Sequence, residues 1–214
     1  MNKKYKSILF DVDGTLILSH IGLLEGHKYA LKNIGMPVPD EDTLLKCMGP
    51  SPRVSIREIL KVPEDKVELA YIINRGYVYT RGYKEFEIID GMVDLVKDLY
   101  FAGYKLYTAS TKVDWLCELC LKEMGILQFF EKVCGACNDG VTRYLKDDVI
   151  KYAIECGAED CIIIGDRKFD IDSAKNCGID SIGITFGYGS KEEVEEHNPT
   201  YVCNSVEEIR KILL

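Results

Sequence analysis

The hydrophobic and polar positions of the chain follow two patterns, and the change between them comes near residue 90. From about residue 19 to residue 89 the apolar positions recur every three or four residues, which indicates helices and few strands. After Gly91 short apolar runs alternate with segments of helical spacing, and a glycine follows most of those segments. Strands that alternate with helices predict right-handed βαβ crossovers and therefore a parallel sheet.

The expected elements follow from these patterns. In the first part we expect a strand at 5–10 and helices over about 24–34, just after Pro39-Asp40, near 54–60 and over 64–80. In the second part we expect helices over 91–102, 113–124, 146–156, 170–177, near 191 and over 205–213. Strands are expected there at 104–109, near 133–134, and at 161–164, 181–185 and 201–202. The predicted fold is α/β: residues 1–18 and 88–214 form a parallel-sheet core, and residues 19–87 form a helical domain inserted after the first strand.

Composition and charge narrow the class of protein. The chain is 47% hydrophobic, so it has enough apolar material for a sizeable core. Its 27 basic and 35 acidic residues give a net charge of −8, and no basic run interrupts this balance, so we expect no binding of a nucleic-acid polymer. The first ten residues lack a signal-peptide core, and no apolar run is long enough to span a membrane. We therefore expect a cytoplasmic protein, in which the nine cysteines are reduced thiols.

Carboxylates follow the first strand of the predicted sheet. Asp11 and Asp13 stand two residues apart, so in an extended segment their side chains point to the same side, and Gly14 lets the chain turn away. Two carboxylates that lie this close repel each other unless a cation lies between them or one of them is protonated. In open α/β sheets ligands bind at the carboxyl ends of the strands, which is where this pair is expected.

Other polar residues are expected at the same edge of the sheet. Ser110-Thr111-Lys112 follows the second core strand, where hydroxyls beside the backbone N–H groups of an opening helix would form an anion site. Gly165-Asp166 follows a later strand, Asp170 lies one helical turn further, and Lys146 opens the helix before that strand. Each feature alone is typical of a turn, a helix cap or a solvated surface residue. Their coincidence at the strand ends predicts a site for a phosphate or a hard metal ion.

The sequence resembles the haloacid dehalogenase superfamily, and specifically its phosphatase branch with a small helical cap of the C1 type. Four motifs match in order and spacing: Asp11-Val12-Asp13-Gly14-Thr15-Leu16, Ser110, Lys146, and Gly165-Asp166-Arg167-Lys168-Phe169-Asp170. Three further fragments are similar to the subgroup of phosphoglycolate phosphatases and 5′-nucleotidases: Tyr29-Ala30-Leu31-Lys32, Met48-Gly49-Pro50 and Gly187-Tyr188-Gly189-Ser190. The resemblance implies the Rossmann-like core of that superfamily, with residues 19–87 as its cap.

The resemblance also implies a reaction. Asp11 would be the nucleophile that forms an aspartyl-phosphate, and Asp13 would act as general acid and then as general base. Asp11, the backbone carbonyl of Asp13, and Asp166 would hold Mg²⁺. Ser110, Thr111 and Lys146 would bind the phosphoryl oxygens, and Asp170 would anchor Lys146 or a metal-bound water. The expected activity is hydrolysis of a small phosphorylated metabolite, such as phosphoglycolate or a nucleoside monophosphate, by a monomer or homodimer.

The chain departs from the pattern of the mutases in this superfamily. β-Phosphoglucomutase-like members carry Glu before the fourth-motif aspartate and a His twelve residues after the nucleophile, whereas this chain has Gly165 and Leu23 there. Hydrolysis is therefore favoured over isomerisation. Arg53, after Gly49-Pro50-Ser51-Pro52, is a candidate for contacting a substrate carboxylate or a second phosphate, and His20 is a candidate hinge or cap residue.

Two alternatives come from other classes. Cys117-x-x-Cys120 and Cys134-x-x-Cys137 have a spacing close to that of a structural zinc site or a redox dithiol, although the first pair lies in an apolar helical segment typical of core packing. A non-catalytic domain that merely kept the fold would be expected to have lost Asp11, Asp13 or Lys146, and all three are present.

Overall fold

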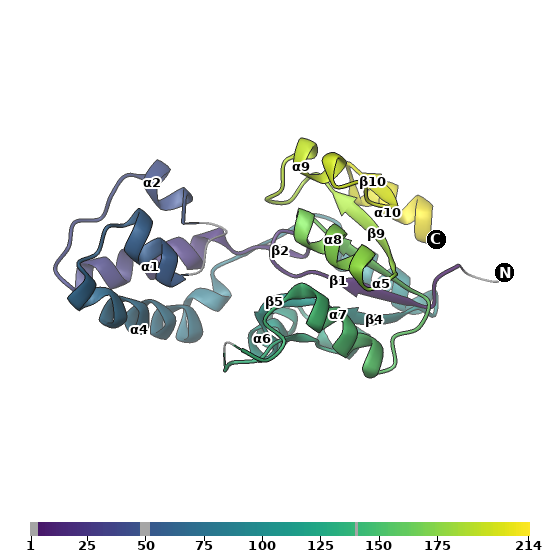
Figure 1. The fold of residues 1–214 in the computed structure, drawn as a ribbon. Helices are drawn as coiled ribbons and strands as arrows, with labels where there is room; N and C mark the ends of the chain where they lie inside the picture. The colour runs from purple at the N-terminus through teal and green to yellow at the C-terminus, as the bar shows by residue number, and fades with distance from the viewer. Residues whose placement is uncertain (1–3, 48–51, 140) are drawn as a thin grey trace. The chain divides into compact units, whose positions relative to one another are not determined.

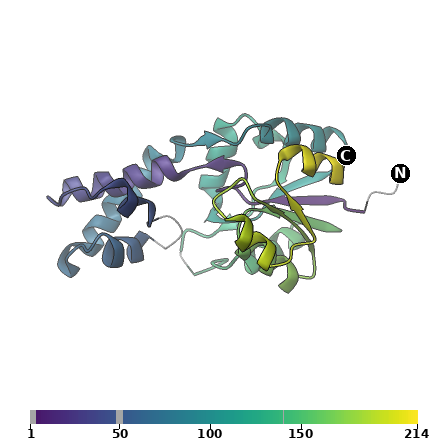
Figure 2. The same ribbon diagram turned by 90° about the horizontal axis from the view of Figure 1, so that it is seen from above.

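The computed structural model describes residues 4–47, 52–139 and 141–214, and its ribbon is drawn in Figures 1 and 2. The chain divides into two compact units, one formed by the residues up to Leu18 together with Glu87–Leu214, the other by Ser19–Phe86. None of the described helices is both long enough and apolar enough to cross a membrane.

A six-stranded parallel sheet forms the centre of the larger unit. Its spatial order is β10-β9-β8-β1-β4-β6, and all five of its strand pairs are parallel. The strands are β1 (Ser7–Phe10), β4 (Lys105–Thr108), β6 (Phe130–Lys132), β8 (Cys161–Gly165), β9 (Asp180–Ile184) and β10 (Tyr201–Cys203). All four residues of β1 are buried, because β1 lies inside the sheet and helices cover its faces. The α/β fold predicted from the alternating pattern is thus confirmed.

Helices connect the strands and bury the sheet. They are α5 (Met92–Phe101), α6 (Asp114–Glu123), α7 (Lys146–Glu155), α8 (Lys168–Asn176), α9 (Lys191–Glu196) and α10 (Val206–Leu213), with the short 3₁₀ turn η3 (Leu127–Phe129). On one face of the sheet Leu9, Tyr107 and Ile163 pack against side chains of α7 and α8, among them Val149 and Ala174. Alternate strand residues therefore point to opposite faces, as the pleat requires.

The segment around Val133 differs from expectation. The sequence predicts a strand at 133–134, but β6 ends at Lys132 and the next strand, β7, is Gly135–Ala136. Between them the Thr108 hydroxyl accepts a hydrogen bond from the backbone N–H of Cys134 at 2.7 Å and donates to its carbonyl at 2.9 Å. A side chain thus satisfies the backbone groups that a strand partner would otherwise have bonded.

Two short strand pairs outside the six-stranded sheet were not expected. β5 (Ser110–Val113) pairs with β7, so the segment Ser110-Thr111-Lys112 is extended and does not open a helix; α6 begins at Asp114. The expectation that these three residues open a helix is therefore wrong. β2 (Ile17–Leu18) and β3 (Glu87–Ile88) form an antiparallel pair where the chain leaves and re-enters this unit.

The smaller unit is helical. It contains α1 (His20–Asn33), α2 (Glu41–Leu45), α3 (Pro52–Val54), the π-helical η1 (Ser55–Ile59), α4 (Glu64–Thr80) and the 3₁₀ turn η2 (Gly82–Lys84). Its core is lined by Leu24, Leu31, Leu44, Ile56 and Val67 among others. The backbones of α1 and η2 lie so close together that a Cβ atom on Gly22 would be only 2.0 Å from the carbonyl oxygen of Gly82.

His27 on α1 makes the stability of this unit dependent on pH. The side chain is only 4% exposed, and among the described residues its Nδ1 has no hydrogen-bond partner. Burial lowers the pKa of His27 from 6.5 to about 4, so the unfolded chain takes up this proton first as the pH falls. The contribution of His27 to the free energy of unfolding is therefore fully present above pH 6.5. It is lost as the pH falls from 6.5 to 4, by about 3 kcal/mol in all.

Urea unfolding of the wild type and of His27→Leu checks this expectation. The free energy of unfolding of the variant should fall less between pH 7 and pH 4.5 than that of the wild type, since other titrating groups contribute equally to both. Parallel pH dependences of the two proteins would contradict it.

Candidate active site

The carboxyl ends of β1 and β8 meet at the point where the order of the sheet reverses. From β1 the chain builds β4 and β6 on one side, and then β8, β9 and β10 on the other. Phe10 pairs with Ile164, and the backbone N–H of Asp11 donates to the carbonyl of Ile164 at 2.9 Å. Asp11 and Asp166 are the first side chains beyond these two strands. Such a switch point is the usual ligand position in an open α/β sheet.

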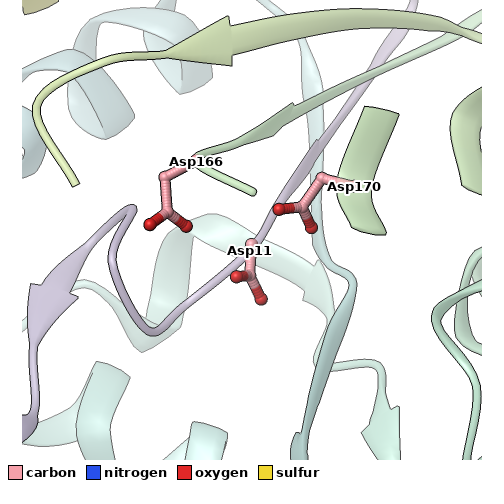
Figure 3. A group of neighbouring side chains, drawn as sticks. All are labelled: Asp11, Asp166 and Asp170. Carbon is pink, nitrogen blue, oxygen red and sulfur yellow. The ribbon is translucent and has the colours of Figure 1, made fainter. Parts of the chain in front are cut away.

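Three aspartates converge there, as Figure 3 shows. Asp11, Asp166 and Asp170 are all buried, and each offers a carboxylate oxygen that lies within 4.8 Å of the other two. Asp170 comes from the first turn of α8, which follows β8 after Arg167. In the described ranges, this is the one group of three or more His, Cys, Asp or Glu side chains close enough to share a metal ion.

Lys146 links two of these carboxylates. Its Nζ atom lies 2.8 Å from Asp11 Oδ1 and 2.7 Å from Asp170 Oδ1, and it donates to the carbonyl of Ala109 at 2.9 Å. Burial by itself would lower the pKa of the ammonium, but the two carboxylates raise it above its usual range. Lys146 is therefore a fixed positive charge inside the site, held at the first residue of α7.

Two glycines make room for the acidic group. A Cβ atom on Gly165 would lie 2.2 Å from Asp170 Cγ, and one on Gly14 would lie 2.2 Å from Asp166 Oδ2. Gly14 also has φ +84°, a left-handed conformation that favours glycine. Asp170 is held by Lys146 and by the backbone N–H of Arg167, which donates to its Oδ2 at 3.1 Å. The sequence predicts that Asp170 anchors Lys146 or a metal-bound water, and the structure places its Oδ1 2.7 Å from Lys146 Nζ.

The loop after β9 supports Asp166. The backbone N–H groups of Tyr188 and Gly189 donate to Asp166 Oδ2 at 2.6 and 3.3 Å. The sequence interpretation used this loop only as a mark of family resemblance and missed its contact with Asp166. The glycines on either side of Tyr188 were the available signal, since they allow the backbone to approach closely: a Cβ on Gly189 would lie 1.9 Å from the Asp166 carbonyl oxygen.

The crowding of these carboxylates changes their acidity. Burial raises the pKa of Asp11 to about 6; the charge of Asp170 adds to this shift, and the charge of Lys146 opposes it. Burial and the charges of Asp11 and Asp170 raise the pKa of Asp166 to about 7, although the N–H groups of Tyr188 and Gly189 oppose the shift. A positive charge placed among these oxygens would reverse both shifts.

Asp13 lies beside a lysine that the sequence interpretation did not assign. The Nζ atom of Lys112 lies 2.7 and 2.8 Å from the two carboxylate oxygens of Asp13. Ser110 is buried, and its Oγ accepts from the backbone N–H of Lys112 at 3.3 Å. The neighbouring Thr111 is exposed. The site thus holds four carboxylates and two ammonium groups, which leaves two negative charges when all six are ionised.

This donor set fits a hard dication. Carboxylate oxygens are the ligands that Mg²⁺ prefers, and a charge of +2 would balance the excess. The three converging aspartates, rather than any nitrogen or sulfur ligand, define the place where such an ion would bind.

The two candidates outside this group lie in the smaller unit. Arg53 on α3 is exposed, donates to both carboxylate oxygens of Glu68 at 2.9 and 3.2 Å, and stacks on the ring of Tyr71 with Cζ 3.6 Å from the ring centre. His20 is the first residue of α1. The segment Gly49-Pro50-Ser51, which precedes Pro52 and Arg53, lies outside the described residues.

The cysteine pairs do not assemble a metal site in the described chain. Cys117 and Cys120 are buried in α6, where the Cys117 thiol donates to the carbonyl of Lys112 at 3.6 Å, and Cys134 is buried after β6. Neither pair belongs to a cluster of three or more potential ligands among the residues that the structure describes. The zinc alternative is therefore not supported by the geometry.

A family model and several known proteins match most of the chain. The family model of haloacid dehalogenase-like hydrolases matches residues 8–184. The chain is 32% identical to the tyrosine-protein kinase PtkA of Mycobacterium tuberculosis, over 96% of this chain and 72% of the relative. It is 29% identical to a 5′-nucleotidase of Pseudomonas aeruginosa, over 98% and 96% of the two chains. It is 27% identical to a phosphoglycolate phosphatase of Vibrio cholerae, over 99% and 98%.

A solved structure agrees over the full length. A candidate phosphatase from Clostridium difficile superposes with a TM-score of 0.92 and 36% identity, covering 100% of both chains. These matches confirm the resemblance predicted from the four motifs, and with it the expectation of a hydrolase.

Proposed function

Because the chain belongs to the family of haloacid dehalogenase-like hydrolases, we propose that it is a Mg²⁺-dependent phosphomonoesterase with Asp11 as the nucleophile. The observation that carries the proposal is the placement of Asp11: its buried carboxylate contacts Lys146 and lies beside Asp166 and Asp170 at the switch point of the sheet. A carboxylate that attacks a phosphate dianion meets electrostatic repulsion, so positive charge must already be in place.

Asp11, Asp166 and the backbone carbonyl of Asp13 are the groups that would hold Mg²⁺. When bound, the ion neutralises phosphoryl charge as a Lewis acid. Lys146 supplies a second positive charge that the protein itself fixes, through its contacts with Asp11, Asp170 and Ala109. Ser110, Thr111 and Lys146 would bind phosphoryl oxygens.

The chain's residues can complete the reaction in two half-reactions. In the first, a carboxylate oxygen of Asp11 bonds to phosphorus, the ester P–O bond breaks, and Asp13 gives its proton to the leaving oxygen. In the second, a water oxygen bonds to phosphorus and the bond to Asp11 breaks, while Asp13 takes the proton of the water. Inorganic phosphate leaves, and both aspartates return to their starting forms.

Replacing Lys146 by methionine is expected to reduce both activity and stability. Phosphate release should fall by about a hundredfold or more, because a preorganised charge at the phosphoryl group is lost. The free energy of unfolding measured without metal should fall by about 3 kcal/mol, because Asp11 and Asp170 lose their buried counter-charge. Steady-state kinetics and urea unfolding measure the two effects.

Lys151→Met is the matched control for this variant. Lys151 lies on the same helix, α7, and is exposed. The Lys151→Met substitution also removes one positive charge. Equal losses of activity and of unfolding free energy in the two variants would therefore show that the position of Lys146 is unimportant.

The names of the relatives suggest the substrate class. Relatives named 5′-nucleotidase and phosphoglycolate phosphatase align over nearly their full lengths, which supports a small phosphorylated metabolite of one of these two kinds. We further propose that the smaller unit is a cap over the leaving group, and that the protein acts in the cytoplasm as a monomer or homodimer. The nine cysteines, all within the described residues, are free thiols and suit a reducing compartment.

A substrate panel with Mg²⁺ tests this function. Phosphate release is measured from phosphoglycolate, nucleoside monophosphates, sugar phosphates and phosphotyrosine, the last because one relative is named a tyrosine-protein kinase. The proposal expects hydrolysis of phosphoglycolate or a nucleoside monophosphate with the highest kcat/KM. Interconversion of sugar phosphates without phosphate release would support a mutase. Transfer of phosphate from ATP to a tyrosine peptide, with an inactive panel, would support a kinase.

A further inference from the structure

Lys112 is a largely buried cation of the site to which the reaction above assigns no role. It is the third residue of β5 (Ser110–Val113), and its Nζ atom contacts both carboxylate oxygens of Asp13, at 2.7 and 2.8 Å. Its side chain is 11% exposed and that of Asp13 is 29% exposed. Exposed ion pairs contribute little because two flexible side chains must be ordered in water, but this pair is largely withdrawn from water.

The backbone on each side of the pair is held in place. The backbone N–H of Lys112 donates to Ser110 Oγ at 3.3 Å, and its carbonyl accepts from the Cys117 thiol at 3.6 Å. On the other side, Asp13 forms a β-bridge with Ile17, and the N–H of Gly14 donates to the Ile17 carbonyl at 2.7 Å. Hydrogen bonds thus hold the backbone of both residues, and this restricts the rotamer of Asp13.

We propose that Lys112 is a positioning residue for Asp13 in the half-reaction that hydrolyses the aspartyl-phosphate; this proposal rests on the proposed function. That half-reaction needs Asp13 as a carboxylate, since it must accept the proton of the attacking water. An ammonium group in contact with both oxygens fixes the orientation of the carboxylate towards the attacking water. After it has taken the proton of the water, Asp13 serves the next leaving group as the acid.

The second half-reaction follows without any further reactant. The water oxygen forms a bond to phosphorus, and the electron pair of the breaking P–O bond returns to Asp11. One proton of the water goes to Asp13, and inorganic phosphate departs. Lys112 changes neither its covalent bonds nor its charge, so its effect passes entirely through the placement of Asp13.

Kinetics with p-nitrophenyl phosphate as the substrate distinguish positioning of Asp13 by Lys112 from direct binding of the substrate by Lys112. Its leaving group departs without protonation, so the first half-reaction does not need Asp13 as an acid. Lys112→Met should therefore form the phosphoenzyme at nearly the wild-type rate but turn over roughly tenfold to a hundredfold more slowly, a part of the usual general-base contribution. Acid quenching during turnover should recover a larger fraction of phosphoenzyme from this variant than from the wild type.

Further variants isolate the path through Asp13. Lys112→Arg keeps the charge and should restore part of the turnover. In the background of Asp13→Asn, Lys112→Met should cause little additional loss, because residues that act as a unit are not additive. Lys105→Met is the charge-matched control: Lys105 is exposed at the first residue of β4, the amino end of that strand, and its loss should leave turnover unchanged.

Four results would overturn the role of Lys112. They are unchanged turnover in Lys112→Met, a phosphorylation rate that falls as much as turnover, a raised KM with unchanged kcat, and an undiminished loss in the Asp13→Asn background. Failure of the proposed function looks different, because Asp11→Asn would then still form a phosphoenzyme or release phosphate at the wild-type rate.

Discussion

Replacing Asp11 by asparagine is expected to lower phosphate release by roughly four to six orders of magnitude, the range seen when a nucleophile is removed. The amide is nearly the same size as the carboxylate, but its oxygen carries no full negative charge and does not form an acyl phosphate. It can still accept the hydrogen bond from Lys146, which lies 2.8 Å from Asp11 Oδ1. The variant should therefore keep its fold while losing its reaction.

Steady-state phosphate release and thermal unfolding measure the two properties together. The matched control is Asp94→Asn, an exposed aspartate on α5 whose weak pair with Lys97 spans 3.6 Å. This control should retain full activity. A folded Asp11→Asn protein with activity near that of the control would contradict the assignment of Asp11.

Removal of divalent metal has the second large expected effect. With EDTA, phosphate release should fall to the level of Asp11→Asn, and excess Mg²⁺ should restore it. The physical reason is the surplus of acidic groups in the site, where four carboxylates face only two lysines and would repel a phosphate dianion. The same surplus predicts that Mg²⁺ binds to the folded protein in the absence of substrate.

Thermal unfolding with and without Mg²⁺ gives a readout independent of activity. Mg²⁺ should raise the melting temperature of the wild type, because a ligand that binds only the folded state stabilises it. Asp166→Asn should remove most of that increase; the asparagine oxygen can still accept from the N–H groups of Tyr188 and Gly189, at 2.6 and 3.3 Å in the wild type. Full activity in EDTA, or an equal Mg²⁺ shift in the variant, would argue against a metal held by these residues.

The part of the site that the sequence could predict is the part determined by strand order. Asp11 and Asp166 follow strands whose alternation with helices indicated a parallel sheet, and parallel strands bring their carboxyl ends to one edge. Lys146 and Asp170 stand in the first turns of helices that the apolar spacing also predicted. For these residues, knowledge of the element was enough to place the side chain.

Contacts made by irregular backbone could not be predicted in the same way. The extended course of Ser110–Val113 depends on pairing with Gly135–Ala136, a segment remote in sequence and too short to have a pattern of its own. The sequence alone therefore places Lys112 just before a helix and does not indicate its contact with Asp13. The hydrogen bonds of Tyr188 and Gly189 to Asp166 likewise depend on the path of a loop, which no periodicity records.

Phosphorylation of Asp11 during turnover can be detected by mass spectrometry. The protein is mixed with substrate and Mg²⁺, quenched in acid within the first turnovers, digested and examined by mass spectrometry. We expect one phosphoryl group on the peptide that contains Asp11, absent from Asp11→Asn and enriched in Lys112→Met. Phosphate release with no phosphorylated peptide in either the wild type or Lys112→Met, or phosphorylation at another residue, would contradict it.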